Sequence, residues 1–225
     1  MPSVLLVGAS RGIGFELARQ YREAGWRVIA TARSAEGLDR LQALGCETLR
    51  VDVAQPAGNS GLAWALDGGK LDLAIYVAGA MDRAGALQPP TRDAFDQVMH
   101  TNVMGAMQVI PQILPMLQEA HGTLACISSV MGSLQSTTQG NAALYRVSKA
   151  ALNMVVRCVQ AEQPDVTVLA LHPGWVQTDM GGAQAPLTVA ESTSSLRQTL
   201  EQVRTQRAAK HRGAFLNHDG TPLPW

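Results

Sequence analysis

The chain has 225 residues, of which 46% are hydrophobic and 16% are charged, and its 18 basic side chains balance its 18 acidic ones. A balanced charge lacks the electrostatic footprint that nucleic acid or an anionic membrane surface needs, so we expect neither as a partner. The low charged fraction predicts a large core and is compatible with further burial in a homodimer or homotetramer.

Strands and helices alternate from the start of the chain. The apolar run 4–7 leads into a glycine-rich turn, residues 15–25 have helical periodicity, and residues 26–33 are strand-like again. Further β-rich runs lie at 48–53, 71–79, 122–129, 166–173 and 213–220, and amphipathic segments lie near 58–67, 91–119, 145–162 and 188–208. Pro111 and Pro115 should kink the segment 91–119 or begin a new one.

Near-continuous apolar strands separated by helical segments favour right-handed βαβ crossovers, which cover a parallel sheet on both sides. We therefore predict an α/β fold, a single doubly wound Rossmann domain over residues 1–225 with a seven-stranded parallel sheet and helices on both faces. Such sheets bind ligands beyond the carboxyl ends of their strands, so we look for chemistry in the residues that follow each strand.

The first strand is followed by VGASRGIG, which places Gly8, Gly12 and Gly14 before a helix. Glycines here allow a tight turn, let the backbone approach a pyrophosphate and direct the N–H groups of the helix toward it. An ordinary glycine-rich turn is the alternative, because such a motif is weak on its own.

Arg33 follows the second strand, where an NAD site normally has an acidic residue for the ribose 2′-hydroxyl. A guanidinium would instead bind a 2′-phosphate, with Arg11 as a second cation, which favours NADP(H). The alternative is that Arg33 is a solvated loop residue. Asp52, after the third strand, could accept from the adenine amino group or cap a helix.

Tyr145 and Lys149 lie one turn apart in LYRVSKAALNM, a segment with helical periodicity, and so share a face. A nearby ammonium favours the phenolate, so we expect Lys149 to lower the tyrosine pKa from about 10 and allow proton exchange at neutral pH. Ser128 and Ser129 end a predicted strand upstream, where a serine hydroxyl could hold a carbonyl oxygen. Asn102 lies further upstream.

The glycine turn, Asn102, the serine pair and Tyr145 with Lys149, in that order, resemble the short-chain dehydrogenase/reductase family over essentially the whole chain. Within that family, YRVSKAALNM, LHPGWVQTDMGG, APLTVAEST and DGTPLPW resemble the sniffer and C-factor-like carbonyl reductases. The resemblance implies an NADP(H)-dependent oxidoreductase that transfers hydride between its cofactor and a small carbonyl or alcohol substrate.

The resemblance also implies a role for each site residue. Ser129 would position the carbonyl, Tyr145 would be the acid/base, Lys149 would lower its pKa and hold the nicotinamide ribose, and Asn102 would support a water in the proton relay. The cofactor would lie against Gly8, Ser10, Arg11, Gly12, Ile13, Gly14, Arg33, Asp52, Val53, Ala78, Gly79, Tyr145, Lys149, Pro173, Gly174, Val176 and Thr178.

Three positions depart from the family pattern. Val7 replaces the usual threonine before the first glycine, and Tyr76-Val77 replaces the usual Asn-Asn before Ala78 and Gly79. Ser129 and Tyr145 are 16 positions apart, a longer spacing than usual, so Ser128 remains the alternative to Ser129. A catalytically weak NADP(H)-binding signalling or sensor protein on the same fold is the alternative function, and a scaffold is a third.

Three features of the sequence bear on compartment and metal content. Cys46, Cys126 and Cys158 are odd in number and lack Cys-x-x-Cys spacing, which fits free thiols in a reducing cytoplasm. The first ten residues, MPSVLLVGAS, lack a basic region, and their apolar run is too short for a signal peptide or a membrane span. No cluster of His, Asp and Cys has metal-ligand spacing, so we expect no metal site.

Overall fold

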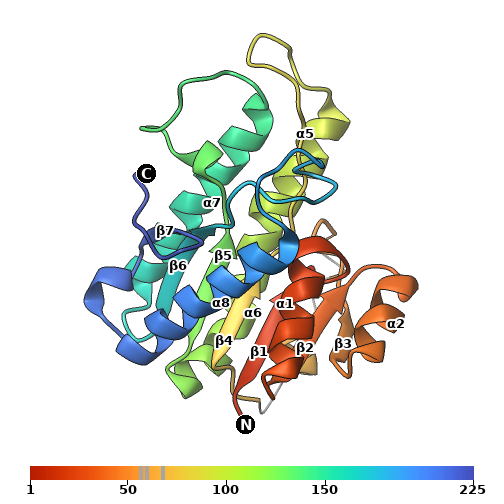
Figure 1. The fold of residues 1–225 in the computed structure, drawn as a ribbon, viewed down its shortest axis with the longest axis vertical. Helices are drawn as coiled ribbons and strands as arrows, with labels where there is room; N and C mark the ends of the chain where they lie inside the picture. Colours follow the sequence, from red (N-terminus) through yellow and green to blue (C-terminus); the bar gives the residue numbers. More distant parts are fainter. Residues whose placement is uncertain (56–57, 59–60, 67–68) are drawn as a thin grey trace.

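Seven parallel strands form one sheet in the computed structural model, which describes residues 1–55, 58, 61–66 and 69–225 (Figure 1). The strands are β1 (Ser3–Val7), β2 (Arg27–Ala32), β3 (Glu47–Arg50), β4 (Leu73–Tyr76), β5 (Thr123–Ile127), β6 (Thr167–His172) and β7 (Phe215–Asn217). Their order across the sheet is β3-β2-β1-β4-β5-β6-β7. The order reverses between β1 and β4, and a doubly wound sheet binds its ligands at such a switch point. The predicted seven-stranded parallel sheet is confirmed.

The helices connect successive strands. They are α1 (Gly12–Glu23), α2 (Ala35–Ala43), α4 (Leu62–Ala65), α5 (Arg92–Met99), α6 (Gly105–Ala120), α7 (Ala143–Glu162) and α8 (Val189–Gln206). A π-helical segment, His100–Met104, joins α5 to α6, and short 3₁₀ turns lie at Val130–Gly132 and Ala209–His211. Residues 59–60 and 67 of the segment predicted near 58–67 lie outside the described residues.

Alternate residues of each strand point into two separate cores, as the period of two requires. On one face, Val4 and Leu6 of β1 pack with buried residues of α1, α2 and α8. On the other face, Leu5 and Val7 pack with buried residues of α4, α6 and α7. The prediction of helices on both faces is therefore confirmed.

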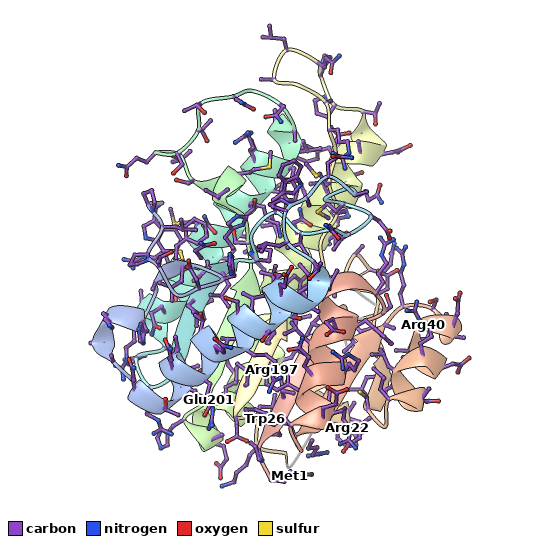
Figure 2. The ribbon with its side chains drawn as sticks, viewed as in Figure 1. Met1, Arg22, Trp26, Arg40, Arg197 and Glu201 are labelled. Carbon is purple, nitrogen blue, oxygen red and sulfur yellow. The ribbon has the colours of Figure 1, made fainter. Side chains whose placement is uncertain are left out.

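On the first of these faces, aromatic rings and arginine side chains pack α8 against α1. The rings of Tyr21 and Trp26 lie 4.9 Å apart, and the Arg197 guanidinium from α8 lies 4.8 Å from the Tyr21 ring; Figure 2 labels Trp26 and Arg197. This cation–π contact packs α8 against the C-terminal end of α1. In the described part of the chain, no helix is both long and apolar enough to cross a membrane.

Two local features differ from the sequence-based expectations. Helix α2 is absent from the predicted segments because it is short and mostly polar; Ser34 caps it by accepting from the Gly37 N–H at 3.2 Å. Pro111 and Pro115 do not begin a new segment, since both lie within α6, and the alternative of a kink stays a prediction. Both prolines are exposed, so water can satisfy the carbonyls that they leave without a helical donor. The change of helical geometry comes earlier, at the π-helical segment.

Candidate active site

The glycine turn after β1 forms a cradle that side chains would fill. Gly8 has φ +88°, and a Cβ there would lie 2.8 Å from Ala78. A Cβ on Gly14 would lie 2.6 Å from the Gly8 carbonyl oxygen, and Gly12 has φ +52°. The Gly8 N–H donates to Thr31 Oγ1 at 2.9 Å, so a neighbouring strand supplies a side-chain bond that Val7 cannot.

The start of α1 fits an anionic group. Arg11 precedes the helix and offers it no side-chain acceptor, and within the described residues 1–55 the first turn has no acidic residue. The first N–H groups of the helix can therefore point at a phosphate, which the positive end of the helix dipole favours. Ser10 and Ile13 lie half-buried in the same turn. The predicted pyrophosphate cradle is thus chemically suited to a dinucleotide.

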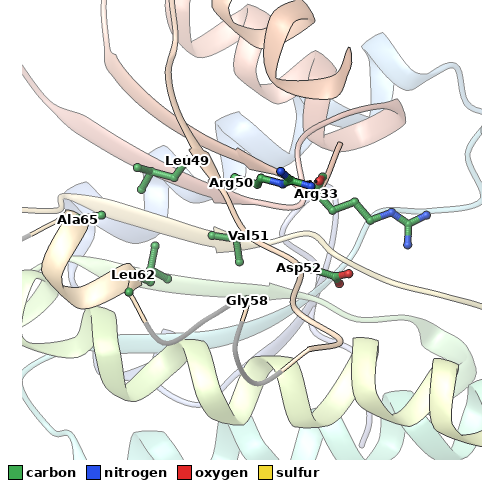
Figure 3. Close-up of a pocket in the computed structure, with 9 residues that line it drawn as sticks. Arg33, Leu49, Arg50, Val51, Asp52, Gly58, Leu62 and Ala65 are labelled. Atoms are coloured by element: carbon green, nitrogen blue, oxygen red, sulfur yellow. Dashed lines mark hydrogen bonds between the residues drawn. The ribbon is translucent and has the colours of Figure 1, made fainter. Parts of the chain in front are cut away.

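Arg33 lies at one end of a cavity of about 490 Å³, together with Arg50 and Asp52 (Figure 3). The Arg50 Nε donates to the Arg33 carbonyl oxygen at 3.3 Å, so a second cation stands beside the expected phosphate-binding residue. Sequence reasoning missed Arg50; its signal was the strand register, which pairs it with Ala32 just before Arg33. Asp52 caps its own turn, where its Oδ1 accepts from the Ala54 N–H at 3.1 Å.

Arg11 makes a contact that the sequence did not predict. Its Nη1 lies 2.7 Å from Asp179 Oδ2, and both side chains are more than two-thirds exposed. An ion pair so exposed contributes little stability and can exchange partners. In the same loop, the Met180 carbonyl oxygen accepts from Arg83 at 2.6 Å. The loop after β6 thus contacts arginines from two other segments of the chain.

Asn102 is fully buried and already has three partners. Its amide nitrogen donates to Ala80 O and Ser148 Oγ, both at 2.8 Å, and its Oδ1 accepts from the Ala80 N–H at 2.7 Å. A Cβ on Gly79 would lie 3.6 Å from Asn102 Oδ1 and 3.7 Å from Lys149 Nζ. Asn102 and Lys149 thus face the same small space beside Gly79.

Tyr76, one of the departures from the family pattern, supports the segment that carries Asn102. Its ring is almost completely buried, and its hydroxyl donates to the Thr101 carbonyl oxygen at 2.6 Å. This bond connects β4 to the π-helical segment that carries Asn102.

The two candidate serines point to different partners. Ser128 Oγ donates to Asn153 Oδ1 inside the core, whereas Ser129 is the serine that interacts with the Tyr145 phenol and lowers its pKa. Ser129 Oγ also accepts from the Met131 N–H at 3.1 Å, which begins the 3₁₀ turn. The geometry brings Ser129, and not Ser128, to the tyrosine.

Lys149 is buried beneath Tyr145. Its Nζ donates to the Ile127 carbonyl oxygen at 2.8 Å and lies 5.6 Å from the centroid of the Tyr145 ring. Burial lowers the pKa of Lys149 to about 8, and interaction with the Cys126 thiol acts in the opposite direction.

The pKa of Tyr145 is where the electrostatic expectation was wrong. Burial raises it to about 12, and the hydrogen bond with Ser129 opposes this only in part. Burial therefore outweighs the lowering that we expected from Lys149. The phenol is therefore protonated at neutral pH and suited to donate a proton.

The segment after β6 borders the cradle. Gly174 has φ +82°, and the place of its missing side chain is taken by Leu187 and His218. Ser192 Oγ donates to the Pro173 carbonyl oxygen at 2.6 Å, and Thr178 Oγ1 accepts from the Gly181 N–H at 3.0 Å.

Val176, the remaining predicted residue of this segment, is buried beside Thr178. A Cβ on Gly12 would lie 3.5 Å from Thr178 Cγ2, so Thr178 touches the glycine turn across the switch point. The residues predicted after β1, β4, β5 and β6 thus lie together at the carboxyl ends of these strands. Among the described residues, no group of three or more His, Cys, Asp or Glu side chains could hold a metal ion.

The family model for the short chain dehydrogenases matches residues 2–187. The chain belongs to this family. The short-chain dehydrogenase is 38% identical over 161 residues to C-signal of Myxococcus xanthus, which covers 70% of this chain and 94% of that protein.

Solved structures of the same family match this short-chain dehydrogenase over its full length. The carbonyl reductase Sniffer of D. melanogaster superimposes with a TM-score of 0.92 and 28% identity, covering 100% of both chains. A carbonyl reductase from Pseudomonas aeruginosa PAO1 in complex with NADP has a TM-score of 0.85 and 32% identity, again over 100% of both chains. The resemblance to sniffer-type reductases is confirmed, and this short-chain dehydrogenase is a carbonyl reductase-like oxidoreductase.

Proposed function

We propose that this chain is an NADP(H)-dependent carbonyl reductase or alcohol dehydrogenase of the class EC 1.1.1.-, formed by one domain over residues 1–225. The observation that carries the proposal is the buried contact of Ser129 with Tyr145, with Lys149 directly beneath, beside the glycine cradle. The relative solved with NADP supports the choice of cofactor.

In the reductive direction, bound NADPH supplies the hydride that reaches the carbonyl carbon. Ser129 and Tyr145 hold the carbonyl oxygen by hydrogen bonds, and Tyr145 gives its phenolic proton to that oxygen as the carbon–oxygen double bond becomes single. A pKa of about 12 keeps the phenol protonated and ready as the acid. A proton from bulk solvent would then restore the phenol, passed along a water held beside Asn102 and Lys149.

Lys149 has a second role in the proposal, to hold the nicotinamide ribose. Its pKa of about 8 keeps most of the side chain cationic at neutral pH. The pyrophosphate would lie against the glycine turn, the 2′-phosphate against Arg33, and adenine against Asp52 and Val53. The adenine ribose would lie near Ala78 and Gly79, and the nicotinamide would lie near Pro173, Gly174, Val176 and Thr178.

Replacement of one oxygen atom tests the proposed acid. Purified protein should oxidise NADPH in the presence of at least one member of a panel of aldehydes, ketones and quinones. Tyr145→Phe should lower kcat by about 10²- to 10⁴-fold, the usual contribution of a general acid, and should leave the affinity for NADPH within a few-fold of wild type. A wild-type kcat in Tyr145→Phe would contradict the assignment of Tyr145 as the acid.

The second candidate is a catalytically weak NADP(H)-binding signalling or sensor protein. The observation in its favour is the relative named C-signal, which is 38% identical over 161 residues. Tight NADPH binding in a fluorescence titration, with no turnover on any member of the panel, would select this candidate. Turnover that depends on Tyr145 would select the reductase.

Two features support the proposed setting of the enzyme. Cys46, Cys126 and Cys158 are all free thiols, which fits a cytoplasmic location. Met107 on α6 and Val147 and Met154 on α7 are more than half exposed, which supports a homodimer or homotetramer. Light scattering on the purified protein measures the assembly directly, and a monomer at micromolar concentration would contradict this part of the proposal.

A further inference from the structure

The end of the chain folds back on the sheet and is held there. After β7 the backbone turns and returns antiparallel, with the Asn217 N–H donating to Thr221 O and the Leu223 N–H to Phe215 O, both at 2.8 Å. The Trp225 ring stacks on Phe215 with centroids 5.3 Å apart, and the Arg157 guanidinium lies 5.8 Å from the centroid of the same ring. Trp225 therefore has a fixed position although its ring is about one-third exposed.

From this position Trp225 reaches the long loop between β5 and α7. Its main-chain oxygen accepts from the Gln135 N–H at 3.1 Å and from Ser133 Oγ at 3.2 Å. Ser133 is completely buried, and its hydroxyl also accepts from the Ser136 N–H at 3.0 Å. Figure 1 shows the end of the chain beside this loop. The contact thus connects two segments that lie far apart in the sequence.

Ser133 is one short turn from the proposed catalytic groups. The Gly132 N–H donates to Ser129 O at 2.8 Å, and the Ser133 N–H donates to Val130 O at 3.0 Å, so a 3₁₀ turn links Ser133 to Ser129. A Cβ on Gly132 would lie 2.7 Å from the Lys149 backbone, so this turn packs directly on α7. A shift of Ser133 would therefore move the turn that carries Ser129.

We propose that Trp225 is a positioning residue of the active site: its ring fixes this last segment against β7, and its main-chain oxygen holds the loop at Ser133 and Gln135. This arrangement keeps the Ser129 hydroxyl against Tyr145. It also accounts for the unusual spacing between Ser129 and Tyr145, because a longer loop loses more entropy on ordering and needs an additional anchor. The inference rests on the proposed role of Ser129 in carbonyl reduction.

Kinetics of the full-length enzyme with NADPH test the inference. Trp225→Ala should lower kcat by about 10- to 100-fold, because small misplacements of a reacting group have effects of this size, and should leave the Kd for NADPH within about two-fold. Trp225→Phe retains a ring for Phe215 and should recover most of kcat. Trp64→Ala, which removes an exposed tryptophan on α4, is the matched control and should behave as wild type. A wild-type kcat in Trp225→Ala overturns the proposal.

Ser133→Ala provides a second variant in case Trp225→Ala folds poorly. It removes one of the two hydrogen bonds to the Trp225 main-chain oxygen and should also lower kcat. The double variant should lose little more than Trp225→Ala alone, since both changes act on one contact. If the fold-losses in kcat of the two single variants multiply in the double variant, the two residues do not act through one contact.

Hydrogen exchange separates this inference from the proposed function. Trp225→Ala and Ser133→Ala should both increase exchange in residues 130–142, whether or not a substrate has been found. If the wild type reduces no carbonyl compound, the proposed function fails, and the exchange result alone decides whether Trp225 holds the loop. Unchanged exchange in that loop overturns the inference.

Discussion

The buried charge of Lys149 should lower the free energy of unfolding of the protein. Burial lowers its pKa from 10.5 to about 8, and at about 1.4 kcal/mol per unit this corresponds to about 3 kcal/mol at neutral pH. Lys149→Met keeps the length of the side chain and removes the buried charge. The variant leaves the Ile127 carbonyl oxygen without the Lys149 donor, at a cost of about 1 to 2 kcal/mol. We therefore expect Lys149→Met to increase the free energy of unfolding by about 1 to 2 kcal/mol near pH 7.

The pH dependence gives the prediction a sign that can be checked. Below about pH 8 both the folded and the unfolded wild type carry the proton on Lys149, and the full destabilisation is present. As the pH rises from about 8 toward 10.5, the folded state loses this proton while the unfolded state keeps it, so the wild type gains stability relative to the variant. The advantage of Lys149→Met should shrink over this range.

Urea unfolding followed by circular dichroism at about pH 7 and about pH 9.5 measures both effects. Lys210→Met, a change at an exposed lysine, is the control and should show no such difference between the two pH values. A variant less stable than wild type at pH 7, or an advantage that grows with pH, would refute the reasoning that burial dominates the energetics of Lys149.

Three further outcomes follow from the site geometry. Gly8→Ala should lose about 1 to 3 kcal/mol of stability and most of its affinity for NADPH, because its Cβ would meet Ala78. Gly25 also has a positive φ but has nothing within 4 Å of its Cβ position, so Gly25→Ala should lose stability and keep its NADPH affinity. Equal NADPH affinities in the two variants would contradict a cofactor-binding role for the glycine turn. Ser129→Ala should lower kcat by about 100-fold and leave the melting temperature unchanged. Ser128→Ala should lower the melting temperature and have little effect on kcat. The opposite pattern would show that Ser128, and not Ser129, is the catalytic serine. Arg33→Asp should shift the ratio of kcat/KM for NADPH over NADH toward NADH by about 10- to 100-fold, and an unchanged ratio would show that Arg33 does not contact the 2′-phosphate.

Much of the fold was predictable from the sequence because buried parallel strands leave a strong pattern. The central strands are short apolar runs, and successive residues point to the two faces of the sheet, as Val4 and Leu5 illustrate. Helix α2 was not predicted because a short polar helix depends on its cap at Ser34 rather than on a stripe of apolar residues. The π-helical segment was not predicted because one extra residue in a helical turn cannot be recognised from the spacing of apolar residues.

The site was predictable in its residue types and less so in its energetics. The motif brought Tyr145 and Lys149 together, but the direction of the tyrosine pKa depended on burial, which sequence spacing does not contain. The choice between Ser128 and Ser129 depended on which hydroxyl faces Asn153. The cation at Arg50 became visible only when strand register placed it beside Arg33.

Tyr76 and Gly105 give the chain a constraint on its evolutionary history. The phenolic oxygen of Tyr76 lies 2.5 Å from the place that a Cβ on residue 105 would occupy. A lineage that kept Tyr76 could not accept even alanine at 105, and one that lost Tyr76 would leave a hole the size of a phenol against α6. The Val53 backbone oxygen lies 2.7 Å from the same place, so it excludes a Cβ at 105 even where residue 76 is not tyrosine. Related sequences should therefore keep glycine at 105 whatever residue stands at 76, while position 76 is free to change.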